Sequence, residues 1–162
     1  FWHQTGYGFI NHNGHFLGTD LRGDAAVEVA FRGGFTEQFD QAGLMLYGGP
    51  THWLKAGVER SDGRLHASVV ATAGHSDWSV APLPDRSHGQ VLTFRASRKG
   101  DAVTVRYRVG EEDAWEMLRL AYLPPEAGFR AGPMCCSPTR AGLVVSFESV
   151  RVGPPDAALH ED

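Results

Sequence analysis

The sequence predicts an all-β protein made of two stacked antiparallel sheets. Short runs rich in β-branched and aromatic residues recur along the chain, and turn residues separate them at short intervals. The 162 residues include 20 glycines and nine prolines, and no stretch has a convincing helical period. A chain of this length is expected to form one domain with a sizeable core.

The first element expected is a hairpin around Asn13 and Gly14, because both residues tolerate the positive φ angles of a type I′ turn. This hairpin would place His12 opposite His15. Two neighbouring histidines raise the question of a metal site, but zinc sites need ligands in spaced pairs, which this chain lacks. We therefore predict histidines at the surface, no metal and no cofactor.

The next four elements are β-rich runs at residues 25–33, 41–47, 53–60 and 64–72. An Asp62-Gly63 pair separates the last two runs. Asp-Gly is a strong signal for a two-residue hairpin turn, so these two runs are predicted to pair with each other.

Counting back from this turn sets the register of the hairpin. Glu59 is expected opposite His66, and Lys55 opposite Val70, and directly paired residues share a face. One face is then apolar and predicts a core: Leu54, Ala56, Val58, Ala67, Val69 and Ala71. The other face mixes polar and aromatic residues. Pairing Leu46 with Leu54 by matching apolar faces extends this polar face to Gln41, Gly43, Met45 and Tyr47.

The rest of the chain predicts one polar loop, five more strands and a tail. The segment HSDWSV at His75–Val80 is expected to be a loop. The strands are expected at Val91–Ser97, Ala102–Val109, Trp115–Leu123, Phe129–Cys136 and Leu143–Val152. We place a single domain at residues 1–153, and we expect residues 154–162 to be a frayed tail.

Charge, hydropathy and cysteine content exclude several classes of protein. The net charge of -4 with scattered Lys and Arg disfavours a nucleic-acid binder. No apolar run approaches the roughly 20 residues of a membrane span. The only cysteines, Cys135 and Cys136, are adjacent and are not expected to bond to each other. Two cysteines are also too few to staple a secreted scaffold, so a reduced, cytoplasmic location is expected.

The chain resembles an uncharacterised bacterial and fungal family of concanavalin-A-like domains that includes the yeast regulation of enolase protein. The resemblance spans nearly the whole chain and rests on QAGLMLY (41–47), WLKAGVE (53–59), HSDWSV (75–80) and GPMCCSP (132–138), in that order. It implies a two-sheet antiparallel jelly-roll sandwich, the fold of concanavalin A-like lectins and glucanases, whose concave sheet carries ligands. It implies little about chemistry, because the family lacks an assigned activity and fold does not fix function.

In such a fold the polar face becomes the floor of a binding site. Gly43 and Gly57 would let a ligand approach the backbone closely. Lys55 has no acid directly opposite, which makes it the sharpest clue to a ligand. Arg119 alternates with apolar residues and could clamp an acidic group. The predicted ligand-binding residues are Gln41, Tyr47, Trp53, Lys55, Glu59, Asp77, Trp78 and Arg119.

We interpret the chain as a protein that binds a small polar ligand, most readily a carbohydrate, on this floor. The alternative is a small-metabolite enzyme of the isomerase, lyase or cyclase type, with Lys55, Glu59 or His66 as acid or base. A third option is an interaction module that meets another protein. A glucanase is disfavoured, because glucanases of this fold carry an E-x-D-x-E strand that is absent here. A cysteine nucleophile stays open, and the sequence does not fix the oligomeric state.

Overall fold

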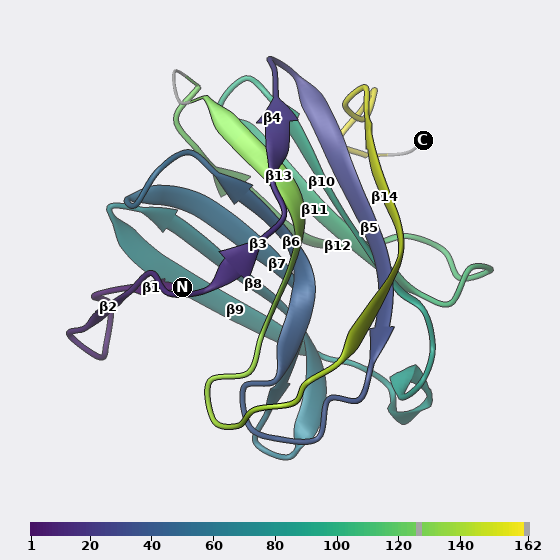
Figure 1. The fold of residues 1–162 in the computed structure, drawn as a ribbon. Helices are drawn as coiled ribbons and strands as arrows, with labels where there is room; N and C mark the ends of the chain where they lie inside the picture. Colours follow the sequence, from purple (N-terminus) through teal and green to yellow (C-terminus); the bar gives the residue numbers. More distant parts are fainter. Residues whose placement is uncertain (126–127, 161–162) are drawn as a thin grey trace.

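Two antiparallel sheets are stacked face to face in the computed structural model, which describes residues 1–125 and 128–160 (Figure 1). One sheet has five strands in the order β12 (Glu116–Tyr122), β11 (Ala102–Val109), β10 (Leu92–Lys99), β5 (Ala25–Gly33) and β14 (Val145–Gly153). The two-sheet sandwich predicted from the sequence is therefore confirmed.

The second sheet has seven strands and carries the candidate site. Its path is β3 (His15–Phe16), β13 (Phe129–Cys136), β6 (Gln41–Tyr47), β7 (His52–Ser61), β8 (Arg64–Ala73) and β9 (His75–Pro82), and β4 (Thr19–Leu21) also pairs with β13. Two short strands, β1 (Trp2–His3) and β2 (Ile10–Asn11), pair only with each other, and η1 (Asp85–Ser87) is a single 3-10 turn. No helix in the described part of the chain is long and apolar enough to cross a membrane.

The β7–β8 hairpin has the register that the sequence predicted. Asp62 and Gly63 take φ angles of 51° and 79°, as a type I′ turn requires. Glu59 lies opposite His66 and Lys55 opposite Val70. The β6–β7 register, predicted from apolar matching alone, is also confirmed, since Leu46 lies opposite Leu54.

The main core lies between the two sheets. It includes the apolar face predicted for the hairpin, together with inward residues of the five-stranded sheet such as Val27, Val29, Phe31 and Phe94. Burial of this apolar surface is the dominant favourable term in folding. The side chains of β6, β7 and β8 that point away from this core therefore lie on the outer face of the seven-stranded sheet.

The predicted Asn13-Gly14 hairpin does not form, and neither residue has a positive φ angle. Ile10–Asn11 pairs with β1 instead, and His15–Phe16 pairs with the edge of β13. Gly14 lies against the ring of Phe1, where an added Cβ would come within 2.4 Å of a ring carbon. Pairing with a sheet edge has therefore overridden the local turn signal.

The segment predicted as a polar loop at His75–Val80 is also different, because it lies within strand β9. Gly74, with a φ of 79°, turns the chain so tightly that His75 lies directly opposite Ala73. Because Gly74 alone makes this turn, the sequence shows no run of turn residues between β8 and β9.

The tail beyond β14 has no regular structure between residues 154 and 158, but it is fixed to the five-stranded sheet. Asp156 forms ion pairs with Arg95 and Arg106 on the outer face of that sheet. Its backbone N–H donates to the hydroxyl of Ser97 at 2.8 Å. These contacts hold Asp156 in the tail against the sheet, while residues 161–162 lie outside the described residues.

Candidate functional site

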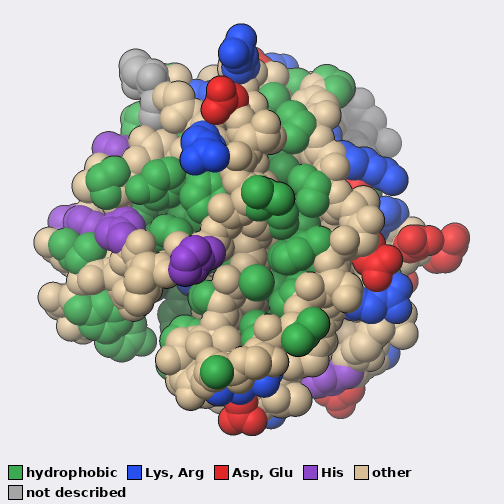
Figure 2. Space-filling view, in the orientation of Figure 1, with side chains coloured by type: hydrophobic (Ala, Val, Ile, Leu, Met, Phe, Trp, Pro, Cys, Tyr) green, Lys and Arg blue, Asp and Glu red, His purple; other side chains and the backbone are tan. Residues whose placement is uncertain are grey.

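The outer face of the seven-stranded sheet, here called the site face, is partly covered by the N-terminal segment, residues 1–16. In Figure 1 this segment crosses in front of the sheet, and in Figure 2 the surface beside it is hollowed. Phe1 packs on Trp53 and Phe16 packs on Tyr47, with ring centroids 5.8 Å and 5.6 Å apart. A second apolar cluster of Met45, Trp53, Val70 and Met134 is thereby buried on this face.

Trp53 and Tyr47, both predicted to bind the ligand, are consequently covered by other aromatic rings. Trp53 has no exposed surface, and its indole Nε1 has no hydrogen-bond partner among the described residues. Tyr47 is only half-buried, but Phe1 and Phe16 lie against its ring. The sequence could not show this cover, because the pairing of β3 with β13 that brings Phe16 there is a long-range contact.

Lys55 lies on the same face of β7, near the α-amino group of Phe1 in this cover, and is buried with 8% of its surface exposed. Its ammonium donates a hydrogen bond of 2.6 Å to Oε1 of Gln41 on β6. Within the described residues it has no carboxylate partner at ion-pair distance. Burial lowers the pKa of Lys55, against the opposing influence of Glu59 and Cys136, so the charged form is held at a cost.

Glu59, two positions past Gly57 on the same face, is also buried, with 5% of its surface exposed. Its Oε2 accepts a hydrogen bond of 3.0 Å from the hydroxyl of Ser68 on β8. Ser68 in turn accepts one of 3.0 Å from Nε1 of Trp78 on β9. A three-residue chain of hydrogen bonds therefore fixes the carboxylate and the indole ring together.

His66 lies directly opposite Glu59, but the two side chains are not hydrogen-bonded. Nδ1 of His66 is buried without a partner among the described residues. The carboxylate therefore does not orient the imidazole, and its Oε2 is bound by Ser68 instead. Ser68 itself was missed as a site residue, although the predicted register already placed it opposite Gly57.

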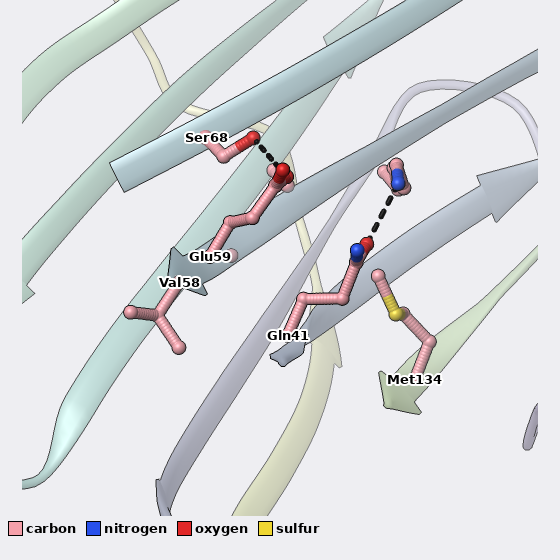
Figure 3. Close-up of a pocket in the computed structure, with 8 residues that line it drawn as sticks. Gln41, Val58, Glu59, Ser68 and Met134 are labelled. Carbon is pink, nitrogen blue, oxygen red and sulfur yellow. Dashed lines mark hydrogen bonds between the residues drawn. The ribbon is translucent and has the colours of Figure 1, made fainter. Parts of the chain in front are cut away.

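A small cavity separates Lys55 from Glu59, and we name it the Lys55–Glu59 cavity. Its volume of about 10 Å³ is space for one water-sized group. Figure 3 shows Gln41, Glu59, Ser68 and Met134 around it, with the hydrogen bonds that hold the charged groups. The lining residues are Gln41, Lys55, Ala56, Gly57, Val58, Glu59, Ser68 and Met134.

The glycine pair Gly43 and Gly57 forms part of the floor because β6 and β7 approach very closely there. The two residues lie directly opposite each other. A Cβ added to Gly57 would lie 2.0 Å from the carbonyl oxygen of Ala42, and one added to Gly43 would lie 2.0 Å from that of Ala56. Packing between strands, rather than ligand access alone, therefore requires glycine at these positions.

Asp77 and Arg119 are not on the site face, contrary to the sequence prediction. Asp77 lies opposite Ala71, whose side chain faces the main core, and Arg119 belongs to β12 of the other sheet. Their side chains form an ion pair of 2.8 Å, and Arg119 also donates to the hydroxyl of Ser79 at 2.9 Å. The pair joins the edges of the two sheets, a contact that strand alternation within one segment cannot reveal.

Cys135 and Cys136 are free thiols on opposite faces of β13. Cys135 packs against the main core, whereas Cys136 lies opposite Gln41 on the site face. Burial raises the pKa of Cys136, although the nearby Lys55 acts in the opposite direction. A raised pKa disfavours the thiolate that a nucleophile needs. Among the described residues, no group of three or more His, Cys, Asp or Glu side chains is arranged to hold a metal ion.

Comparisons with known proteins bear on this geometry. The model of the family described as "Protein of unknown function (DUF1349)" matches residues 1–155. Regulation of enolase protein 1 from Saccharomyces cerevisiae is 37% identical over 163 residues, covering 99% of this chain and 80% of the yeast protein.

Two of the solved structures with a similar fold illustrate the likeness. A functionally unknown protein from Saccharomyces cerevisiae superposes with a TM-score of 0.89 at 35% identity, covering 96% of this chain and 82% of that one. A xylan beta-1,4-xylosidase from Bacillus halodurans gives a TM-score of 0.75 at 14% identity. That match covers 88% of this chain but 30% of the xylosidase, so the shared fold is one part of a longer enzyme.

Proposed function

We propose that this chain, which belongs to the family described as protein of unknown function DUF1349, binds a small polar ligand, a carbohydrate, at the Lys55–Glu59 cavity. One observation carries the proposal. Two opposite charges are buried on the face of a sheet, a cavity separates them, and each is held by a neutral side chain instead of by the other.

Such an arrangement of buried charges is costly without a ligand. An isolated buried charge costs several kcal/mol unless it is paired and fully hydrogen-bonded. The ammonium of Lys55 has three donors, and one hydrogen bond to Gln41 satisfies only the first of them. Binding sites typically place a few convergent polar groups in otherwise apolar surroundings, and the side chain of Met134 supplies an apolar wall here.

The choice of a carbohydrate rests on two supporting points. Trp78 donates its N–H to Ser68, which lines the cavity, and an aromatic ring near such a site can pack against the apolar face of a sugar. The fold also recurs as one part of a xylosidase, an enzyme named for acting on a polysaccharide. At 14% identity this likeness supports the fold, and the ligand is our inference. The cavity itself would hold only the tip of the ligand.

A second candidate function is acid/base catalysis on a small metabolite at the same cavity. The observation that favours it is the lowered pKa of Lys55, caused by burial, because a lysine that loses its proton readily can serve as a general base. A base of this kind would exchange a carbon-bound proton of a substrate with solvent. Proton NMR in D₂O would detect that exchange, and pure binding would produce none.

Calorimetric titration with mono- and oligosaccharides tests the proposal. We expect saturable binding that weakens at least about tenfold in Lys55→Met, because one charge-assisted hydrogen bond contributes about 1.5–3 kcal/mol. Lys55→Met leaves Oε1 of Gln41 without its donor, so the fold of this variant is checked first by circular dichroism. The matched control is Asp77→Asn, which lies off the site face and should bind normally. Equal binding by Lys55→Met and the wild type would contradict the proposal.

A further inference from the structure

The two sides of the Lys55–Glu59 cavity offer complementary hydrogen-bonding roles. The ammonium of Lys55 can only donate, and it uses one of its three donors on Gln41. The carboxylate of Glu59 can only accept, and within the described residues its Oε1 has no hydrogen-bond partner. A group placed between them must therefore accept on one side and donate on the other.

A hydroxyl group meets both requirements, because its oxygen accepts from Lys55 while its O–H donates to Glu59. A carboxylate has no proton to donate to Glu59 and would set a second negative charge beside it. Like charges brought together in a buried site repel each other strongly. An amine would have the opposite difficulty, since it would face the ammonium of Lys55.

The size of the cavity leads to the same chemical class. Its volume of about 10 Å³ admits one group of the size of a water molecule, which suits a hydroxyl and is too little for a sugar ring. Met134 and the backbone of Ala56 and Gly57 close the remaining sides. The rest of a ligand would have to lie outside the cavity.

From this geometry we infer that the ligand is an uncharged polyol or sugar that inserts a single hydroxyl between Lys55 and Glu59, and that the site rejects acidic sugars. The inference rests on the proposed function and names its substrate class. Wild-type protein discriminates by charge because Glu59 faces the inserted group. Replacing that carboxylate with an amide should therefore relax the discrimination.

Matched pairs of sugars that differ only at C6 provide the test. The probes are D-glucose, D-galactose and D-mannose, each with its uronic acid, titrated at pH 7 into wild-type protein and into Glu59→Gln. We expect at least one neutral sugar to bind and its uronate to bind at least tenfold more weakly. Glu59→Gln should reduce the ratio between the affinities for the neutral sugar and its uronate to about threefold or less. Asp77→Asn should leave this ratio unchanged.

Three outcomes would overturn the inference. The first is a uronate that binds as tightly as its neutral partner, which would overturn the inference but leave the proposed function in place. The second is a Glu59→Gln variant that folds, as judged by its circular dichroism, and keeps the full ratio between the affinities for a neutral sugar and its uronate. This result would also overturn the inference and leave the proposed function in place. If no neutral sugar and no uronate binds to the wild type, both the inference and the proposed function are lost.

Discussion

Gly57→Ala is expected to lower the stability of the protein by about 3 kcal/mol or more, or to prevent folding altogether. An alanine Cβ would lie 2.0 Å from the carbonyl oxygen of Ala42 and 2.7 Å from the Cα of Gly43. Both contacts are with backbone, so β6 and β7 would have to move apart at the centre of the sheet. Thermal unfolding measures the effect, and a loss of 3 kcal/mol corresponds to roughly 10 °C in a chain of this size.

The matched control is Gly153→Ala, since Gly153 also lies in a strand and has an ordinary φ angle. An added Cβ there meets no atom within 4 Å, so its stability should stay within about 0.5 kcal/mol of the wild type. If Gly57→Ala unfolds at the same temperature as Gly153→Ala, the close approach of β6 and β7 is not as described.

Asp40→Asn is expected to destabilise the protein by about 2 kcal/mol at neutral pH. Burial alone would raise the pKa of Asp40. Hydrogen bonds from Arg140, the Glu37 N–H, Ser137 and the Thr36 N–H outweigh burial and lower the pKa to about 2. The ordinary value is 3.8, so the difference corresponds to about 2 kcal/mol. Chemical denaturation at pH 7 measures this loss.

The same shift fixes the pH dependence of stability. Because the folded pKa of Asp40 lies below the unfolded one, its contribution is present above about pH 4 and is lost as pH falls through 2. Wild type and Asp40→Asn should therefore converge in acid. The control is Asp113→Asn, which breaks the exposed ion pair with Arg86 and should change stability by less than about 1 kcal/mol. A constant difference between wild type and Asp40→Asn down to pH 2 would contradict this account.

Asp40 also bears on the site, because it immediately precedes Gln41, the residue that accepts the hydrogen bond of Lys55. Its carboxylate binds Arg140 and the hydroxyl of Ser137, and so ties the end of β13 to the start of β6. These contacts join residues about 100 positions apart in the chain. Sequence pattern gave no indication of them.

The strands and the central register could be predicted because their signals are local. The Asp62-Gly63 turn has one favoured geometry, and once it is fixed every pair from Ser61–Arg64 outward follows from counting. The alternation of apolar residues then decides which face is core. Asn13-Gly14 carried an equally strong turn signal, yet pairing with β1 and β13 prevailed there.

The site could be predicted in part for the same reason. Gln41, Lys55 and Glu59 lie on two strands whose register was known, so their common face was correctly expected. Asp77 and Arg119 were misplaced because their positions depend on how the two sheets meet at an edge. The cover on Trp53 depends on the path of residues 1–16 across the sheet. Such long-range packing leaves no periodic trace in a single sequence.

Three methionines allow one direct test of the central claim that ligand binds at the Lys55–Glu59 cavity. Met134 lines the cavity, and Met45 is buried on the same face. Met117 lies on β12 of the other sheet and is nearly half exposed, which makes it an internal control. Methyl-¹³C-methionine NMR spectra of the intact chain report on all three positions at once.

The measurement is a titration of that labelled protein with D-glucose, D-galactose, D-mannose and D-xylose, with the resonance of the Met134 methyl group followed to saturation. Our account predicts that at least one neutral sugar shifts the Met134 resonance saturably while Met117 does not move. A Met134 resonance that stays fixed with every sugar, or a saturable shift at Met117 alone, would contradict it.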